Sequence, residues 1–308
     1  MTLRVGVIGV GHLGRHHARI LSSLPGARLV AVVDTIGGRA AEIATVNRTK
    51  ASTDYRDLLG EVDAVTIAVP TELHREIALP FLEAGVPVLV EKPMTRSLGE
   101  ADDLIAAAAR TNVALAVGHT ERFNPAVAAA RERLTDPRFI EVHRLGTFPE
   151  RSLDIDVVFD LMIHDLDVVL SLVKSDVDSI EAVGVPVLTG RVDIANARLR
   201  FANGCIANLT ASRISRDRVR KIRFFQPMAY LSIDYAAQKV ELWRLVTAKN
   251  GEPSIEGGDV DVTNEEPLKR ELADFVDAIV SRRAPVVTGQ EGRRALALAE
   301  AIAARMAS

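Results

Sequence analysis

The chain has one cysteine, Cys205, and few aromatic residues: one tryptophan, three tyrosines and nine phenylalanines among 308 residues. A single cysteine cannot form a disulfide within the chain. This excludes a disulfide-stabilised secreted scaffold and favours a reducing, cytoplasmic location. No apolar run reaches the ~18–20 residues that a membrane-spanning helix needs. Basic residues form no run and the formal net charge is −3, so we expect neither a nucleic-acid nor a membrane partner. The N-terminus also lacks the layout of a signal peptide.

The composition is that of a globular protein, with 48% hydrophobic and 26% charged residues. A chain of this length predicts about two domains. The pattern of the sequence changes after Gly118, and we place the boundary there. Residues 1–120 are expected to form a dinucleotide-binding domain. Residues 121–308 are expected to form a domain for substrate binding and oligomerisation.

The first domain alternates apolar strand-like runs with helical segments. Continuous apolar strands separated by helices indicate a parallel sheet covered on both faces, an α/β fold of the doubly wound Rossmann type. The strand-like runs are residues 3–8, 28–33, 64–69, 86–90 and 113–117, and the helical segments are 12–24, 39–46, 71–84 and 97–110.

In the second domain, several strand-like runs follow one another without helices between them, which is typical of antiparallel hairpins. We therefore predict an α+β domain with one large, mostly antiparallel sheet and a loop at 249–264. An apolar outer face of that sheet would form a homodimer or homotetramer, and the residues expected there are Ala197, Leu199, Phe201, Leu209 and Ala211. The runs lie near 180–188, 192–201, 205–213, 219–225, 229–234 and 239–246, with helices at 125–134, 157–173, 267–281 and 290–306.

A glycine-rich segment, Gly9-Val10-Gly11-His12-Leu13-Gly14, lies between the first strand and the first helix. This G-x-G-x-x-G spacing allows a tight turn, a close approach of pyrophosphate to the backbone, and close packing of helix on strand. Asp34 ends the second strand, where a carboxylate binds the ribose hydroxyls and repels a 2′-phosphate. The pattern favours NAD over NADP as cofactor, with Arg39 the nearest cation. The alternative is a cluster of turn glycines beside a surface aspartate.

Two further motifs appear in order along the chain: Glu91-Lys92-Pro93 after a strand, and Asp160-Leu161-Met162-Ile163-His164 in a helical segment. With the glycine loop, they resemble the Gfo/Idh/MocA (glucose-fructose oxidoreductase / inositol dehydrogenase) family, which carries E-K-P and D-x-x-x-H signatures. The resemblance implies a nicotinamide-dependent dehydrogenase acting on CH–OH groups. We expect the cofactor site to comprise Gly9, Gly11, His12, Leu13, Gly14, Asp34, Val69, Pro70, Thr71, His74, Glu91 and Lys92.

A narrower resemblance starts at Gly118. The segment Gly118-His119-Thr120-Glu121-Arg122-Phe123-Asn124-Pro125 is similar to the G-H-x-E-R-F-N-P segment of bacterial UDP-N-acetylglucosamine 3-dehydrogenases. This resemblance implies a nucleotide-sugar substrate, with UDP-N-acetylglucosamine favoured. Its diphosphate needs cations or N–H groups. The substrate-binding candidates are Arg122, Asn124, Arg151, His164 and Tyr235, with Arg213, Arg220 and Lys221 as further cations.

Oxidation of a secondary alcohol needs a base to take the hydroxyl proton as hydride leaves. His164 suits this task, and Asp160 lies four residues before it, on the same side of a helix, where it can orient the ring. Lys92 is expected at the carboxyl edge of the parallel sheet, where its ammonium can bind the reacting oxygen. Each residue taken alone could also be structural. Lys92 and His164 both remain candidates for the proton acceptor.

Several alternatives stay open from the sequence. UDP-N-acetylglucosaminuronate or a polyol such as inositol could replace the proposed substrate. A dinucleotide-binding sensor without activity is the non-enzymatic alternative. We expect no metal, because the zinc pattern H-E-x-x-H is absent and one histidine without a paired cysteine makes a poor zinc site.

Overall fold

The computed structural model describes residues 2–148, 155–247 and 252–306, and Arg151 lies outside them. The chain forms two compact units. The first combines Met1–Thr120 with Leu268–Leu296, and the second combines Glu121–Pro267 with Ala297–Ser308. This division differs from a contiguous second domain at 121–308, because a late segment of the chain joins the first unit. In the described part of the chain, no helix is long and apolar enough to cross a membrane.

The first unit is built on a six-stranded parallel sheet in the order β3-β2-β1-β4-β5-β6, which confirms the α/β prediction. The strand order reverses direction at β1, since β2 and β3 lie on one side and β4 to β6 on the other. The strands are β1 (Leu3–Ile8), β2 (Ala27–Val33), β3 (Lys50–Ser52), β4 (Ala64–Ile67), β5 (Val88–Glu91) and β6 (Leu115–Gly118). The helices are α1 (Gly14–Leu21), α2 (Gly37–Asn47), η1 (Tyr55–Leu58), η2 (Thr71–Leu73), α3 (His74–Glu83) and α4 (Leu98–Thr111). The short helix η3 (Thr120–Phe123) begins at the end of this segment and belongs mostly to the second unit.

Helix α7 (Pro267–Ser281) and the start of α8 (Gly289–Met306) belong to this unit for a packing reason. Leu272, Phe275 and Val276 of α7 are buried in the same apolar core as residues of β1 and α1. Burying such side chains stabilises the fold by about 1.5–3 kcal/mol each. The backbone N–H of Val117 in β6 also donates to the carbonyl of Val287. A sequence pattern of local periodicity carries no information about such a return of the chain.

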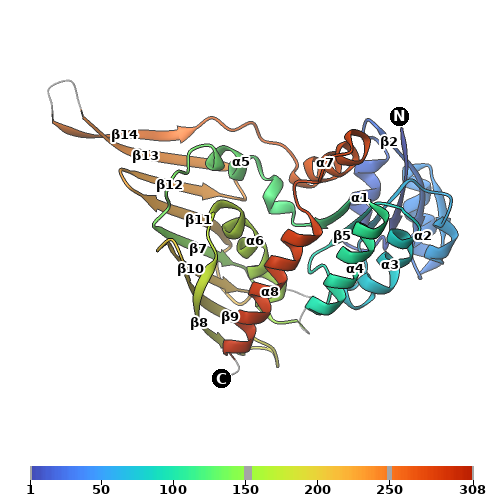
Figure 1. Cartoon of the computed structure of the whole chain (residues 1–308), viewed down its shortest axis with the longest axis horizontal. Helices are drawn as coiled ribbons and strands as arrows, with labels where there is room; N and C mark the ends of the chain where they lie inside the picture. Colours follow the sequence, from blue (N-terminus) through green and yellow to red (C-terminus); the bar gives the residue numbers. More distant parts are fainter. Residues whose placement is uncertain (1, 149–154, 248–251, 307–308) are drawn as a thin grey trace. The chain divides into compact units, whose positions relative to one another are not determined.

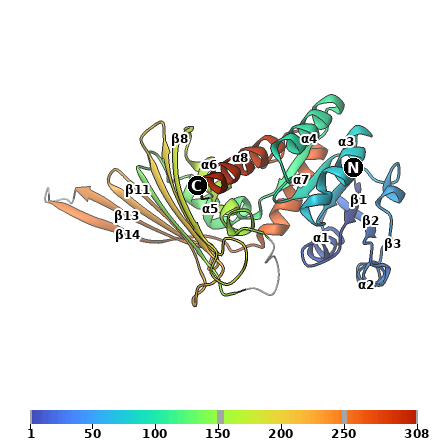
Figure 2. The same ribbon diagram turned by 90° about the horizontal axis from the view of Figure 1, so that it is seen from below.

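The second unit contains an eight-stranded sheet in the order β14-β13-β12-β11-β7-β10-β9-β8 (Figures 1 and 2). All its strand pairs are antiparallel except β7 with β10, which confirms a mostly antiparallel sheet. Strand β14 replaces part of the loop expected at 249–264. Strand β7 was not anticipated. The strands are β7 (Phe139–Leu145), β8 (Val177–Val185), β9 (Ile194–Phe201), β10 (Ile206–Ser212), β11 (Val219–Gln226), β12 (Ala229–Asp234), β13 (Lys239–Thr247) and β14 (Pro253–Val260).

Helices α5 (Pro125–Arg131) and α6 (Ile163–Leu172) and the end of α8 lie on one face of this sheet (Figure 2). Strand β9 alternates buried and exposed residues, as a strand with one covered face should. Its apolar members point to the helices. The prediction of which residues form the outer face is therefore wrong, because each of them is at most 1% exposed within the single chain: Ala197, Leu199, Phe201, Leu209 and Ala211.

The open face instead carries an apolar row that crosses neighbouring strands in register. Phe139 pairs with Phe225, Phe225 with Tyr230, and Tyr230 with Trp243. The rings of Phe139 and Phe225 lie 5.6 Å apart, and those of Phe225 and Tyr230 lie 5.2 Å apart. Aromatic side chains left partly exposed in a row are typical of an interface.

Candidate active site

The glycine-rich loop connects β1 to α1 and has the geometry that a dinucleotide requires. Gly9 has a φ of 81°, a left-handed conformation, and a Cβ there would lie 2.6 Å from the carbonyl oxygen of Ala68. A Cβ on Gly14 would lie 1.7 Å from the carbonyl oxygen of Gly9. At Gly11 the nearest atom to such a Cβ is Nη1 of Arg39, 3.9 Å away, so the backbone is open to a ligand. These residues fit a pyrophosphate at the helix N-terminus.

Asp34 follows β2 and is fixed by the backbone. Its Oδ2 accepts the N–H of Val10 at 3.1 Å, and its Oδ1 accepts the N–H of Ile36 at 2.9 Å. Nη1 of Arg39 lies 3.2 Å from Oδ2, so this cation pairs with Asp34. Asp34 is therefore held at the end of its strand, where the ribose-binding carboxylate is expected. Arg39, which is half-exposed, offsets part of its charge.

The other predicted cofactor residues follow neighbouring strands of the same sheet. Val69, Pro70 and Thr71 come after β4, and Lys92 comes after β5. All four retain solvent exposure, as do His12 and Leu13 in the glycine loop. The carboxyl ends of parallel strands share one edge of a sheet. This edge thus collects these candidates, together with Asp34, in the order β2, β1, β4 and β5.

Glu91 and His74 were also expected to contact the cofactor, but both are buried and engaged by the protein itself. Oε1 of Glu91 lies 3.0 Å from Nε2 of His17 in α1. Burial raises the pKa of Glu91, but the hydrogen bond and charge of His17 and the charge of Lys92 outweigh it, so the pKa lies below its usual value. A Cβ on Gly118 would lie 2.9 Å from this carboxylate. The roles of His17 and Gly118 beside Glu91 were not predicted from the sequence. A buried carboxylate requires a hydrogen-bond partner, which His17 provides, and space, which Gly118 leaves.

His74 bridges two loops. Its Nδ1 lies 3.0 Å from the carbonyl oxygen of Pro93, and its Nε2 lies 3.0 Å from that of Val69. Burial lowers the pKa of His74 more than these carbonyls and the charge of Glu91 raise it. A neutral ring has a single N–H, so the tautomer determines which carbonyl accepts the hydrogen bond.

The segment that carries Asp160 and His164 departs from the expected regular helix. Val158–Met162 forms a π-helical turn, η4, and α6 begins at Ile163. Single π-helical turns occur often at functional sites. Asp160 and His164 are both half-buried, so each has surface that a ligand can reach.

The next acidic residues on α6 form two buried ion pairs. Asp165 binds Nε and Nη2 of Arg144 at 2.6 and 3.0 Å, and Asp167 binds Nε and Nη2 of Arg122 at 2.9 and 3.0 Å. Nη1 of Arg144 also contacts Glu121 at 3.1 Å. Burial lowers the pKa of Arg144, but the negative charges of Asp165 and Glu121 outweigh this effect, so the pKa lies above its usual value. These bidentate contacts clamp α6 to its neighbours.

Three of the residues predicted to bind substrate make contacts within the protein instead. Arg122 is committed to Asp167. Asn124 caps α5 by accepting the N–H of Ala126, and it donates to the carbonyl of Tyr235 at 3.0 Å. Tyr235 is 3% exposed, and the guanidinium carbon of Arg144 lies 5.3 Å from its ring centroid. The geometry gives Arg122, Asn124 and Tyr235 structural positions instead of surfaces open to a sugar.

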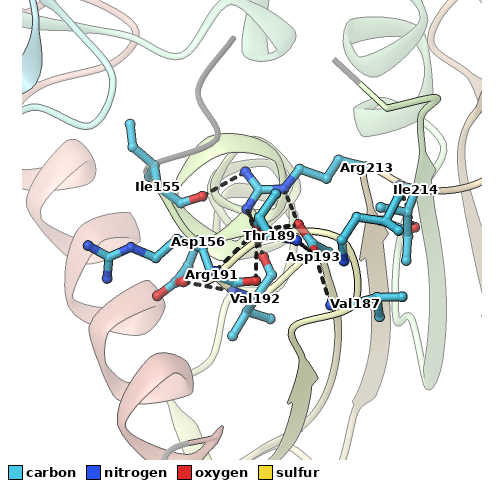
Figure 3. A network of polar contacts seen from close by, with 11 residues as sticks. Ile155, Asp156, Val187, Thr189, Arg191, Val192, Asp193, Arg213 and Ile214 are labelled. Atoms are coloured by element: carbon cyan, nitrogen blue, oxygen red, sulfur yellow. Dashed lines mark hydrogen bonds and ion pairs between the residues drawn. The ribbon is translucent and has the colours of Figure 1, made fainter. Parts of the chain in front are cut away.

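Arg213, a further candidate cation, is 1% exposed and belongs to the network in Figure 3. Its Nε binds Oδ1 of Asp193 at 2.9 Å, and its Nη1 donates to the carbonyl of Ile155 at 2.7 Å. Oδ2 of Asp193 accepts three backbone N–H groups, at 2.7–2.9 Å, from residues 187–189. Burial raises the pKa of Asp193, but these N–H groups hold it well below its usual value. Arg213 is thus unavailable to a diphosphate.

The same network reaches the start of η4. The carbonyl of Val192 accepts Nη2 of Arg213 at 3.2 Å and the N–H of Val157 at 3.0 Å. The N–H of Val192 in turn donates to Oδ1 of Asp156 at 3.0 Å.

Lys221 pairs with Asp234 at 3.4 Å, which leaves Arg220, exposed on β11, as the most accessible of the predicted diphosphate cations that are described. Across the described ranges, no group of three or more His, Cys, Asp or Glu residues is arranged to hold a metal.

Comparisons with known proteins show the family of the chain. Residues 3–119 match the oxidoreductase family with an NAD-binding Rossmann fold, and residues 129–225 match the GFO/IDH/MocA C-terminal domain. The chain is 41% identical over 299 residues to UDP-N-acetylglucosamine 3-dehydrogenase of Acidithiobacillus ferrooxidans, covering 96% of this chain and 95% of that protein. A solved structure of UDP-N-acetylglucosamine 3-dehydrogenase from that organism has a TM-score of 0.92 and 39% identity, and the match covers 99% of this chain and 98% of the other.

A more distant relative is scyllo-inositol 2-dehydrogenase (NAD(+)) of Bacillus subtilis, 32% identical over 232 residues, or 69% of this chain and 68% of the relative. The family assignment makes the protein an NAD-binding oxidoreductase and disfavours a sensor without activity. The glycine loop, the E-K-P and D-x-x-x-H motifs, and the matches over both units agree. The chain belongs to the Gfo/Idh/MocA family of oxidoreductases.

Proposed function

We propose that the protein oxidises the C3 hydroxyl of UDP-N-acetylglucosamine by hydride transfer to NAD. The observation that carries this proposal is the similarity to UDP-N-acetylglucosamine 3-dehydrogenase, which extends over 96% of the chain. The resemblance of the segment Gly118–Pro125 to those dehydrogenases is consistent with it. An inositol substrate is less favoured, because the inositol relative matches only 69% of the chain at lower identity.

In the proposed reaction, the C3–H bond breaks as hydride leaves, the O–H bond breaks as the proton leaves, and a C3 carbonyl forms. Bound NAD supplies the hydride acceptor. His164 takes the hydroxyl proton, and Asp160 orients the imidazole and stabilises its charged form. Lys92 binds the reacting oxygen and stabilises the negative charge that grows on it. The products are a 3-keto sugar nucleotide, NADH and one proton.

The diphosphate of the substrate needs a cation that the fold has not already paired. Arg220 on β11 meets this need best among the described candidates, since Arg122 and Arg213 are committed to Asp167 and Asp193. Arg151 remains a candidate from the sequence.

We also propose that two copies of the chain associate through the open sheet face, as a homodimer or within a homotetramer. The aromatic row from Phe139 to Trp243 supplies the apolar centre. The neighbouring row is charged in both signs, with Arg223 paired to Glu141 at 2.7 Å, so it can complement a second copy of itself. A monomeric mass at micromolar concentration would contradict the association.

A cytoplasmic location completes the proposal, since one cysteine and a soluble cofactor suit that compartment.

The function is tested by mixing the protein with NAD and one candidate substrate at a time while following the absorbance of reduced nicotinamide. The candidates are UDP-N-acetylglucosamine, UDP-N-acetylglucosaminuronate, and myo- and scyllo-inositol, each with a ketone trap to draw the equilibrium forward. We expect turnover with UDP-N-acetylglucosamine at the highest kcat/KM. A higher kcat/KM for either inositol or for the uronate would replace the proposed substrate.

A further inference from the structure

Two buried histidines hold the residues on either side of Lys92. His17, from α1, contacts the carboxylate of Glu91 at 3.0 Å. His74, from α3, contacts the carbonyl oxygen of Pro93 at 3.0 Å. The tripeptide after β5 is thus fixed through its first residue by a side chain and through its third residue by the backbone.

Neither histidine can act on a ligand directly. His17 is 0% exposed and His74 is 1% exposed, whereas Lys92 between them is only half-buried. Gly118 at the end of β6 makes the arrangement sterically possible, because any side chain there would occupy the position of the Glu91 carboxylate. Lys92 is therefore the member of the tripeptide that can meet a substrate.

His74 has a second contact, 3.0 Å from the carbonyl oxygen of Val69 in the loop after β4. One ring thus spans the loops that follow two adjacent strands, β4 and β5. Both loops lie at the edge that binds the cofactor. The neutral ring donates its single N–H to one of the two carbonyls and contacts the other. By these two contacts it sets the spacing between the backbone at Val69 and the backbone next to Lys92.

We propose that His17 and His74 are positioning residues for Lys92, and that His74 in addition fixes the distance between the Lys92 loop and the Val69 loop. This inference rests on the proposed role of Lys92 in hydride transfer. A displacement of about 1 Å of a reacting group can lower a rate about 100-fold. The two histidines would thus control turnover without touching substrate or cofactor.

The test compares His74→Phe and His17→Leu with the conservative variants His74→Gln and His17→Gln, each of which retains a side-chain N–H donor group. We expect His74→Phe and His17→Leu to lower kcat about 10- to 100-fold. The Kd for NADH, measured by fluorescence titration, should stay within about threefold, since the glycine loop and Asp34 are unchanged. The glutamine variants should recover part of the loss. The control is Phe81→Leu, a change at a buried residue of α3 that should lower stability and leave kcat unchanged.

A double-mutant cycle separates positioning from general damage to the fold. In a Lys92→Ala background, residues that act through Lys92 have nothing left to position, so His74→Phe and His17→Leu should cause no further loss in kcat. A further loss of the same size as in wild type would overturn the inference. If a large variant does not fold, the glutamine variants in the same cycle decide the matter. Near-normal turnover in Lys92→Ala itself would instead refute the proposed role of Lys92.

Discussion

The buried ion pair between Arg213 and Asp193 allows a quantitative prediction about the stability of the second unit. Both side chains are at most 1% exposed. Removing one partner of a buried pair typically lowers the free energy of unfolding by about 3–5 kcal/mol, because it leaves a charge uncompensated. In Arg213→Met, Asp193 keeps the three backbone N–H groups and the hydroxyl of Thr189. We therefore expect the lower end, about 3 kcal/mol.

Asp193→Asn should be worse than Arg213→Met. An amide has one oxygen, so its NH₂ group would face either the backbone N–H donors or the guanidinium. It also leaves the Arg213 charge buried without its Asp193 partner, beside the carbonyls of Ile155 and Val192 and the hydroxyl of Thr189. We expect the upper end of the same range, about 5 kcal/mol.

The assay is urea unfolding followed by tryptophan fluorescence. Trp243 on β13 is the one tryptophan of the chain, so the signal reports on the second unit alone. The matched control is Arg138→Met, which breaks an exposed pair with Asp136 in the same unit and should lower stability by less than about 1 kcal/mol. Equal shifts of the midpoint in Arg213→Met and Arg138→Met would refute the reasoning.

Four further outcomes are expected. Asp34→Ala should weaken NADH binding and reduce the preference of the protein for NADH over NADPH, both measured by fluorescence titration. Wild type that binds NADPH at least as well as NADH would contradict the ribose assignment. Lys92→Ala should stay folded and bind NADH with turnover reduced by orders of magnitude, and normal turnover would remove it from the mechanism. His164→Ala should lower kcat about 10²–10⁴-fold and Asp160→Asn less. In the wild type, kcat should rise with pH as the general base loses its proton, and this rise should vanish in His164→Gln. If the rise persists in His164→Gln but vanishes in Lys92→Met, Lys92 is the base. The folded protein holds the pKa of His74 below 6.5, so acid favours unfolding. Below about pH 6.5, His74 should lower the free energy of unfolding of the wild type by up to about 1.4 kcal/mol per pH unit. His74→Gln lacks this contribution, and equal pH slopes in the two proteins would contradict the reasoning.

The parts of the site that local patterns predict are those built from a strand, a turn and a helix. The glycine loop, Asp34 and Lys92 each follow a continuous apolar run, and parallel topology then brings the ends of those runs to one edge. The positions of Glu91 and His74 were less predictable. Periodicity shows that a residue ends a strand or starts a helix, but not whether its side chain points at a ligand or into the protein.

Buried charge explains most of the other differences. Strand β7 was missed because the charged residue Arg144 takes one of the buried positions of its alternation, and only the tertiary structure shows Arg144 neutralised by Asp165. For Arg122 and Arg213, the sequence cannot distinguish an arginine that binds a phosphate from one that binds a carboxylate of the same chain. The return of α7 to the first unit depends on contacts across more than two hundred residues, between Leu272 and the core that contains Leu3.

The central claim is that hydride leaves C3 of UDP-N-acetylglucosamine, and isotopic labelling tests this most directly. The protein is incubated with NAD and UDP-N-acetylglucosamine that carries deuterium at C3 of the sugar, and the reduced nicotinamide is analysed by mass spectrometry. The account predicts that the NADH formed carries one deuterium and that the sugar product has lost it. Unlabelled NADH, with deuterium retained in the oxidised sugar, would show that oxidation occurs at another carbon and would contradict the account.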